Sequence, residues 1–241
     1  MWSPWRVFFI LEAVRLDVMS STAQTLNELY DALMARFGPQ DWWPGGTPFE
    51  VMVGAVLTQN TNWKNVEKAI ENLKRQRLLD PFALHAVPVE RLGELIRPSG
   101  YYNIKARRLK NLTALLVEEY AGDLQALFSG PLDEVQRRLL RVRGVGLETA
   151  DSIILYAAER PTFVIDSYTC RVISRHGLVM PGACYEEVKS LFEDNLPRDV
   201  RLFNEYHALL VRVAKEYCRK RARCQGCPLE GFPHDVEFEA F

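Results

Sequence analysis

The sequence has no apolar run long enough to cross a bilayer and no strong excess of charge of either sign. Its 241 residues carry a net charge of −1, so no global field draws the chain toward nucleic acid or a membrane surface. The apolar stretch at residues 7–11 is short and is followed by acidic residues, which argues against a secretory signal. We therefore expect a cytoplasmic protein of a bacterium or archaeon that has no membrane partner.

Cysteines are few and odd in number. There are five, and with no export signal this count argues against a disulfide framework. Three of them, Cys218, Cys224 and Cys227, lie within ten residues. Closely spaced soft ligands of this kind are typical of an iron–sulfur or zinc site.

Alternating strands and low-complexity tracts are also missing, whereas helical spacing of apolar residues recurs throughout the chain. We predict an all-α protein of about ten helices, the first of them beginning at the capping residues 20–22. The predicted helices cover residues 22–37, 49–57, 62–73, 88–96, 104–120, 132–140, 148–158, 167–176, 185–195 and 200–218.

Positive charge is present locally, in three clusters at residues 105–110, 137–143 and 219–223. Each cluster alone is typical of a solvated helix face. Three clusters in a nearly neutral chain favour a local nucleic-acid surface more than one would.

Two glycines, Gly144 and Gly146, separate two of the predicted amphipathic helices. Glycines at this spacing allow a tight turn with positive φ and let backbone N–H groups approach an anion beside the next helix. A DNA phosphate would fit such a turn, although an ordinary helix–turn–helix joint that binds nothing has the same pattern. Twenty residues later, Asp166 follows Val164 and Ile165, where it is well placed as a helix N-cap.

Together these segments resemble the signature of the helix–hairpin–helix DNA glycosylases of the endonuclease III superfamily. Residues 57–61 (Leu-Thr-Gln-Asn-Thr), 100–106 (Gly-Tyr-Tyr-Asn-Ile-Lys-Ala) and 218–227 also resemble stretches of this family, in the family's order. The resemblance runs from about Trp42 to Cys227, and it is nearest to the monofunctional methyladenine branch.

The resemblance implies two helical domains that flank a DNA cleft. One is a six-helix bundle with the helix–hairpin–helix, at residues 46–160, and the other joins residues 20–45 to residues 161–241. Residues 1–19 are interpreted as a non-native or disordered extension, because Met19 is an alternative start. The implied partner is double-stranded DNA with a damaged base, bound by a monomer.

The resemblance also assigns residues to DNA binding. Gln59 would fill the gap left when a nucleotide rotates out of the duplex. Gly144 and Gly146 would hold the backbone, and Asn103 and Lys105 belong to the matching Gly-x-Tyr-Asn-x-Lys-Ala segment.

By the same resemblance, Asp166 is the catalytic residue. A fixed carboxylate stabilises the positive charge that develops at C1′ as the glycosylic bond breaks. Bifunctional members carry a lysine at the position of Glu148, and a carboxylate cannot form their Schiff base. We therefore expect base removal by water with weak or absent AP lyase activity, and we assign Glu148 no catalytic role.

Aromatic residues suggest the substrate. Tryptophans at such positions are most often core residues, yet Trp43 and Trp63 match aromatic residues that line the base pocket in the methyladenine branch. An alkylated purine carries positive charge, which an indole face attracts. The resemblance therefore implies a pocket for alkylated purines such as methyladenine.

The cysteine loop departs from the family pattern, because no fourth cysteine follows Cys227. His234 is the nearest substitute, since histidine ligates some iron–sulfur centres. A [4Fe-4S] cluster, zinc, and a loop without metal all remain open.

Two alternative functions also remain open. One is an endonuclease III-like glycosylase/AP lyase for oxidised pyrimidines or mismatches. The other is a DNA-binding protein that kept the hairpin and lost catalysis.

Overall fold

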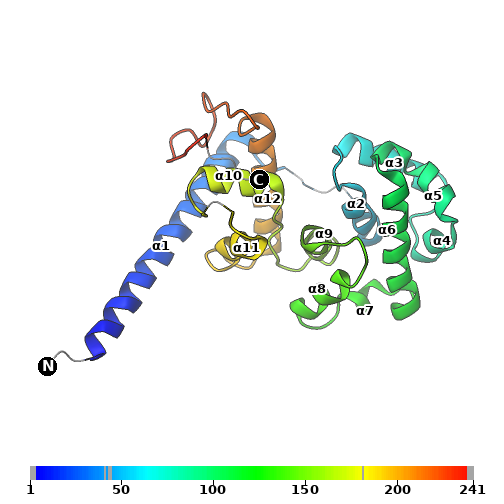
Figure 1. The fold of residues 1–241 in the computed structure, drawn as a ribbon, viewed down its shortest axis with the longest axis horizontal. Coiled ribbons are helices and arrows are strands. Elements are labelled where there is room, and N and C mark those ends of the chain that lie inside the picture. Colours follow the sequence, from blue (N-terminus) through cyan, green and yellow to red (C-terminus); the bar gives the residue numbers. More distant parts are fainter. Residues whose placement is uncertain (1–3, 41, 43–44, 181, 238–241) are drawn as a thin grey trace. The chain divides into compact units, whose positions relative to one another are not determined.

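The computed structural model describes residues 4–40, 42, 45–180 and 182–237, and for residues 4–20 it describes the backbone alone. Every regular element in these residues is helical (Figure 1), which confirms the predicted all-α class. In this part of the chain, no helix has both the length and the apolar character needed to cross a membrane.

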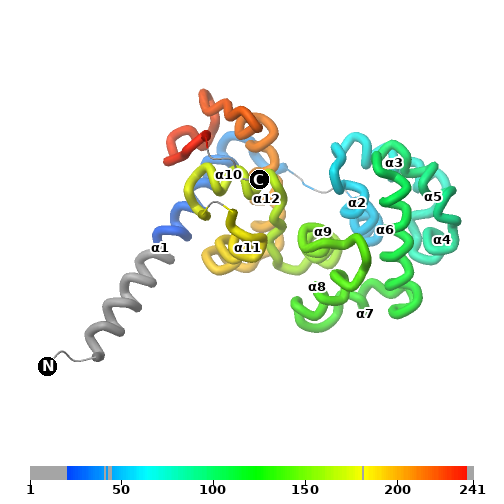
Figure 2. Tube along the Cα trace, viewed as in Figure 1, coloured from blue at the N-terminus to red at the C-terminus, as the bar shows by residue number. Residues whose placement is uncertain are grey.

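The chain divides into two compact units. The continuous unit is Trp43–Thr162, and the discontinuous unit combines Met1–Trp42 with Phe163–Phe241. In Figure 2 the continuous unit runs from light blue to yellow-green, whereas the discontinuous unit joins the blue segment that precedes it to the yellow, orange and red segments that follow it.

The continuous unit contains eight α-helices and three short 3₁₀ or π segments among its described residues. They are α2 (Pro48–Leu57), α3 (Trp63–Arg75), α4 (Pro81–Ala86), α5 (Val89–Leu95), η1 (Arg97–Ser99), α6 (Tyr102–Ala114), η2 (Leu115–Glu119), α7 (Leu124–Phe128), α8 (Leu132–Leu140), α9 (Leu147–Ser152) and η3 (Ile153–Ala157). Helix α2 is the centre of this unit, because every residue from Phe49 to Leu57 is buried. It packs against α3, α6, α9 and η3.

The discontinuous unit is built from α1 (Pro4–Phe37), α10 (Ser167–Arg175), α11 (Tyr185–Glu193) and α12 (Val200–Glu216). Its core holds Phe163 stacked on Phe192, with ring centroids 3.8 Å apart. The Tyr206 hydroxyl donates to the Leu26 carbonyl (2.8 Å) and so ties α12 to α1. Two segments far apart in the sequence therefore share one core.

Three helices differ from the sequence prediction. Helix α1 begins at Pro4, so residues 20–22 lie inside it and the predicted start there is wrong. Helices α4 and α7 were not predicted, since six and five residues are too short to show a helical period. Their caps were readable, because Asp80 and Asp123 accept backbone N–H bonds at the two helix starts.

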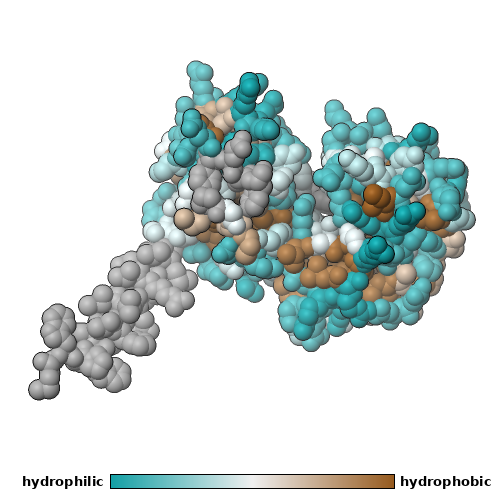
Figure 3. Space-filling model, viewed as in Figure 1, coloured by the Kyte–Doolittle hydropathy of each residue, from teal (hydrophilic) through white to brown (hydrophobic). Residues whose placement is uncertain are grey.

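The face of the molecule drawn in Figure 3 is mostly polar on both units, with apolar residues in smaller patches. The described exposed large apolar side chains include Tyr101 and Ile104, which lie within four residues of each other at the start of α6. The start of α6 is therefore an exposed apolar spot on the continuous unit.

Candidate functional site

The two glycines of the hairpin between α8 and α9 have different structural roles. Gly144 has a φ of +102°, and a Cβ there would lie 2.3 Å from the Arg108 Cγ. Gly146 is extended, with φ −98° and ψ −177°, and it is the N-cap of α9 without a side-chain cap. A Cβ at Gly146 would meet nothing within 4 Å. Gly144 is thus required by the turn, whereas Gly146 leaves the N-terminus of α9 open to an approaching anion.

Gln59 is bonded to this hairpin. Its Nε2 donates to the Gly144 carbonyl (3.1 Å) and to the Thr149 Oγ1 (2.9 Å), and its Oε1 accepts from Arg108. The loop after α2 is therefore joined to the hairpin through one side-chain amide. Arg108 is a residue that sequence reasoning had placed only in a basic cluster, and its contact with Gly144 could not be read from the spacing.

A basic hollow lies beside the hairpin. The residues that line it are Ile104, Arg107, Arg108, Asn111, Arg143 and Gly144. The Asn111 Nδ2 donates to the Arg143 carbonyl (2.9 Å), which connects α6 to the hairpin. Three guanidinium groups around an open glycine turn form a surface suited to an anionic backbone.

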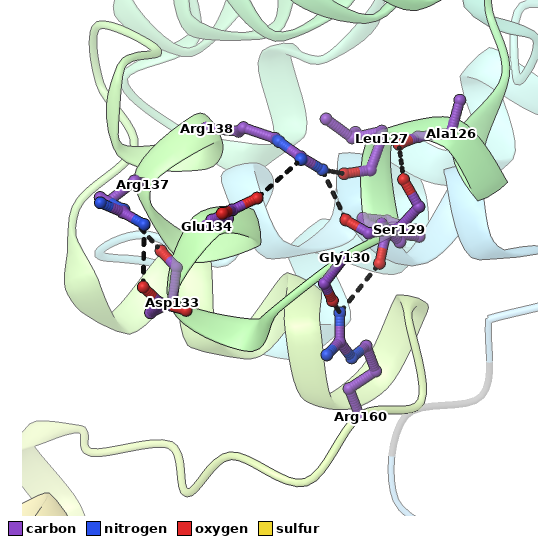
Figure 4. A network of polar contacts seen from close by, with 10 residues as sticks. Ala126, Leu127, Ser129, Gly130, Asp133, Glu134, Arg137, Arg138 and Arg160 are labelled. Carbon is purple, nitrogen blue, oxygen red and sulfur yellow. Dashed lines mark hydrogen bonds and ion pairs between the residues drawn. The ribbon is translucent and has the colours of Figure 1, made fainter.

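In the basic cluster at residues 137–143, most of the arginines bond to other groups of the protein. Arg137 and Arg138 make the polar contacts drawn in Figure 4, and Arg141 also makes a polar contact within the continuous unit. Their partners are Asp133 for Arg137 (2.8 Å), the carbonyls of Leu127 and Ser129 for Arg138 (3.1 and 2.6 Å), and Glu119 for Arg141. In Figure 4, Arg160 also reaches the loop before α8, where it donates to the Gly130 carbonyl (2.8 Å). Arg138, Arg141 and Arg160 therefore tie α8 and the loop before it to neighbouring segments, whereas Arg137 pairs within α8 itself.

Lys105 was predicted to contact DNA, but its side chain is buried. It is 1% exposed, and its ammonium donates to the carbonyls of Leu57 (2.8 Å) and Ser99 (2.7 Å). Burial, together with the nearby charge of Arg108, lowers the pKa of Lys105 to about 8. This burial disagrees with a direct phosphate contact, so Lys105 instead holds the end of α2 against the start of α6.

The neighbours of Lys105 are open to solvent. Asn103 is exposed, as the predicted DNA contact requires. Tyr101 is 68% exposed and has a φ of +44°. A large aromatic side chain held outward on a left-handed backbone is uncommon and is typical of a functional position. Sequence reasoning missed Tyr101, although it follows directly on the Pro-Ser-Gly break.

The predicted pocket tryptophans are described only in part. Trp63 is half-buried and begins α3, whose N-cap is Asn62. Trp43 lies outside the described residues, so the pocket that was assigned to these two rings stays a prediction.

Asp166, in the discontinuous unit, is the N-cap of α10. Its Oδ1 accepts the Thr169 backbone N–H (2.7 Å), and its Oδ2 lies 3.6 Å from the His207 Nε2. The Asp166 side chain is 14% exposed. Burial alone would raise the pKa of Asp166, but the nearby His207 imidazole and the Thr169 N–H outweigh it and hold the pKa below its usual value. The carboxylate is therefore kept ionised in one orientation.

Other side chains from the same unit gather near Asp166. The Trp42 ring lies edge-on to His207, with centroids 6.4 Å apart. The Lys215 Nζ lies 5.7 Å from the centre of the Trp42 ring and 5.5 Å from that of Tyr168. His207 and Lys215 come from α12, 41 and 49 residues after Asp166, so no local motif pointed to them. We call Trp42, Asp166, Tyr168, His207 and Lys215 the Asp166 cluster.

Glu148, the position that departs from the bifunctional pattern, is exposed in the first turn of α9. An acidic residue in this turn is favoured by the helix dipole.

The three loop cysteines line one hollow, which they share with Arg175, His176 and His234. The Arg175 Nη1 lies 3.3 Å from the Cys218 Sγ. Burial raises the pKa of the Cys224 thiol, and so does nearby Cys218. The His176 ring lies 5.6 Å from the His234 ring, and sequence reasoning missed His176 because it closes the distant helix α10. Among the described residues, however, no three candidate ligands converge on one point that could hold a metal ion.

The comparisons with known proteins agree with this geometry. Residues 53–198 match the family described as HhH-GPD superfamily base excision DNA repair protein. A candidate DNA repair glycosylase of Methanocaldococcus jannaschii is 48% identical over 211 residues, which cover 87% of this chain and 96% of that protein. Endonuclease III of Thermotoga maritima is 29% identical over 184 residues, 76% of this chain and 81% of the relative.

Solved structures show the same fold. A 3-methyladenine DNA glycosylase of H. pylori bound to 1,N6-ethenoadenine has a TM-score of 0.69 and 26% identity, covering 81% of this chain and 97% of that one. An endonuclease III–DNA complex has a TM-score of 0.76 at 24% identity, covering 89% and 96%. These matches confirm the family that the motifs indicated. The chain belongs to the HhH-GPD superfamily of base excision DNA repair proteins, the helix–hairpin–helix DNA glycosylases that its sequence resembles.

Proposed function

We propose that this protein hydrolyses the N-glycosylic bond of a damaged base that has rotated out of duplex DNA, with Asp166 as its catalytic residue. The observation that carries the proposal is the fixed carboxylate of Asp166, held by the Thr169 N–H and facing His207. As the bond breaks, its electron pair leaves with the base and C1′ becomes cationic. A negative charge that needs no reorganisation stabilises this cation, and water then adds to C1′.

The DNA contacts are proposed to come from the continuous unit. The open turn at Gly146 and the basic hollow beside it would hold the phosphate backbone of a DNA bound by one protein monomer. Gln59 would fill the space that the rotated nucleotide leaves. Its amide is already bonded to the hairpin carbonyl of Gly144, which supports a place for it beside the bound DNA.

Alkylated purines are the proposed substrates. The solved relative from H. pylori is a 3-methyladenine DNA glycosylase with 1,N6-ethenoadenine bound. The half-buried Trp63 supports a base pocket lined by an aromatic ring, because ring stacking accepts many bases and a cationic base gains further attraction.

Monofunctional chemistry is proposed because the hairpin carries a carboxylate, Glu148, at the position of the family's lysine nucleophile. We expect base release from duplexes that contain 3-methyladenine, followed by strand cleavage only after alkali. Borohydride added during the reaction should trap no covalent protein–DNA adduct.

A panel of duplexes with 3-methyladenine, thymine glycol, uracil and a G·T mismatch tests these points together. Release of the pyrimidines with direct strand cleavage would favour the endonuclease III-like alternative. Duplexes that are bound but left intact across the panel would contradict catalysis and leave a DNA-binding protein.

We also propose that Cys218, Cys224 and Cys227 hold a [4Fe-4S] cluster, with His234 or His176 as the fourth ligand. The three thiols line one hollow without converging on a single point, so a bound cluster would have to draw them together. The buried Arg175 beside the Cys218 sulfur would stabilise the negative charge of the cluster. When bound, the cluster would order the loop that follows α12, and it takes no part in hydrolysis.

Metal analysis tests the cluster. Anaerobically purified protein should contain about four irons per chain and show a broad brown absorption, and both should fall in Cys227→Ser. A colourless protein loaded with zinc, or one without metal, would contradict the cluster.

A further inference from the structure

Lys215 is a charged group near the catalytic carboxylate for which the proposed mechanism has so far no use. It lies on α12, two helical turns after His207, and the Trp42 ring contacts both residues. Lys215 is exposed on the discontinuous unit, so a substrate can reach it. Partial burial lowers the pKa of its ammonium, whereas the negative charge of Asp166 raises that pKa.

The aromatic rings of the Asp166 cluster already hold cations. The Lys215 ammonium lies over both Trp42 and Tyr168, and the Arg171 guanidinium lies 5.2 Å from the Tyr168 ring. A cationic base placed against these rings would meet charge of its own sign. A neutral base would not, and the Lys215 ammonium beside these rings could donate a hydrogen bond to it.

The leaving base needs such a donor when it is neutral. Heterolysis of the glycosylic bond puts the electron pair on the base, so a cationic alkylpurine leaves neutral but a neutral base leaves as an anion. Departure of a cationic alkylpurine therefore requires no acid, whereas departure of a neutral base is greatly assisted by a proton or a positive charge. Asp166 is ionised and supplies charge only to the sugar side of the bond.

We propose that Lys215 protonates or hydrogen-bonds the departing base, so that the site excises neutral base adducts as well as cationic ones. This inference rests on the proposed function, since it needs the base to leave beside Asp166. The ammonium gives its proton to the base nitrogen or oxygen that gains the electron pair. Water adds to C1′, and the proton that this water loses returns to Lys215 directly or through solvent, so the sum is hydrolysis.

The test compares two leaving groups in single-turnover excision. Duplexes with neutral 1,N6-ethenoadenine and with cationic 7-methylguanine are incubated with the wild type, Lys215→Met and Lys215→Arg. We expect Lys215→Met to slow ethenoadenine release by about 10²- to 10⁴-fold, the usual range for a general acid, and 7-methylguanine release by less than about threefold. Lys215→Arg should retain part of the ethenoadenine rate, because it keeps the charge but gives up its proton poorly.

Controls separate this role from a structural one. Lys68→Met removes a lysine from the exposed surface of α3 and should change neither rate. The thermal melting temperature of Lys215→Met should match that of the wild type. Equal slowing of both bases by Lys215→Met, no slowing of either, or a wild type that releases only 7-methylguanine would overturn the proposal.

The proposed function can fail separately. If Asp166→Asn leaves both rates unchanged while Lys215→Met slows ethenoadenine release, the acid role stands and the role of Asp166 falls. A wild type inert on both duplexes overturns the acid role, and the proposed function falls with it only if 3-methyladenine is retained as well.

Discussion

Replacing Asp166 by asparagine should lower the rate of base excision by on the order of 10³-fold, because it removes the fixed negative charge that is proposed to stabilise the cationic sugar. Asparagine is as good an N-cap as aspartate, so the bond from the Thr169 N–H should persist and the protein should stay folded. The measurement is single-turnover release of 3-methyladenine, with the thermal melting temperature recorded on the same sample.

Asp199 supplies a matched control. It caps α12 in the same way, accepting the Leu202 N–H (2.8 Å), and it is exposed in the same unit. Asp199→Asn should leave excision unchanged. If Asp166→Asn costs less than about tenfold, or no more than Asp199→Asn, then charge at Asp166 is not what drives the reaction.

The environment of Asp166 also sets a pH dependence. The pKa of Asp166 is held below its usual value although burial opposes this, chiefly through His207. Because the folded-state pKa is the lower one, the carboxylate stabilises the fold above the unfolded-state pKa, and this contribution is lost as pH falls through the folded-state pKa. In a pH profile, any loss of excision from protonation of Asp166 should therefore set in at a lower pH than an ordinary carboxyl group would give.

Alanine at the two hairpin glycines should have two different effects. Gly144→Ala forces a side chain onto a φ of +102° and against the Arg108 Cγ, so it should cost about 1–3 kcal/mol of stability as well as DNA affinity. Gly146→Ala meets nothing and should leave stability unchanged. It places a methyl group over the open N-terminus of α9, which should weaken duplex binding by about tenfold, the effect of one lost hydrogen bond to a charged group.

Urea unfolding and duplex binding at one fixed salt concentration measure both effects. Salt must be held constant because phosphate contacts make affinity depend steeply on it. Full affinity in Gly146→Ala would mean that the α9 terminus does not face the phosphate backbone. Full stability in Gly144→Ala would show that the turn relaxes around Arg108.

Local sequence patterns predicted the parts of the site that depend on residues close together in the chain. The hairpin glycines and the N-cap at Asp166 were readable because a turn and a cap involve residues only a few positions apart. The all-α class was readable for the same reason, since the spacing of apolar residues directly reflects the helical repeat.

The sequence by itself determined the helical class, the family and the order of the motifs. Only the tertiary structure decided what those motifs touch: it buried Lys105 against Leu57 and Ser99, joined Gln59 to Gly144 and Arg108, and brought α12 to Asp166. The reason is range, because a helix or turn is specified by adjacent residues, whereas burial and ion pairing depend on which distant segments the whole core packs together.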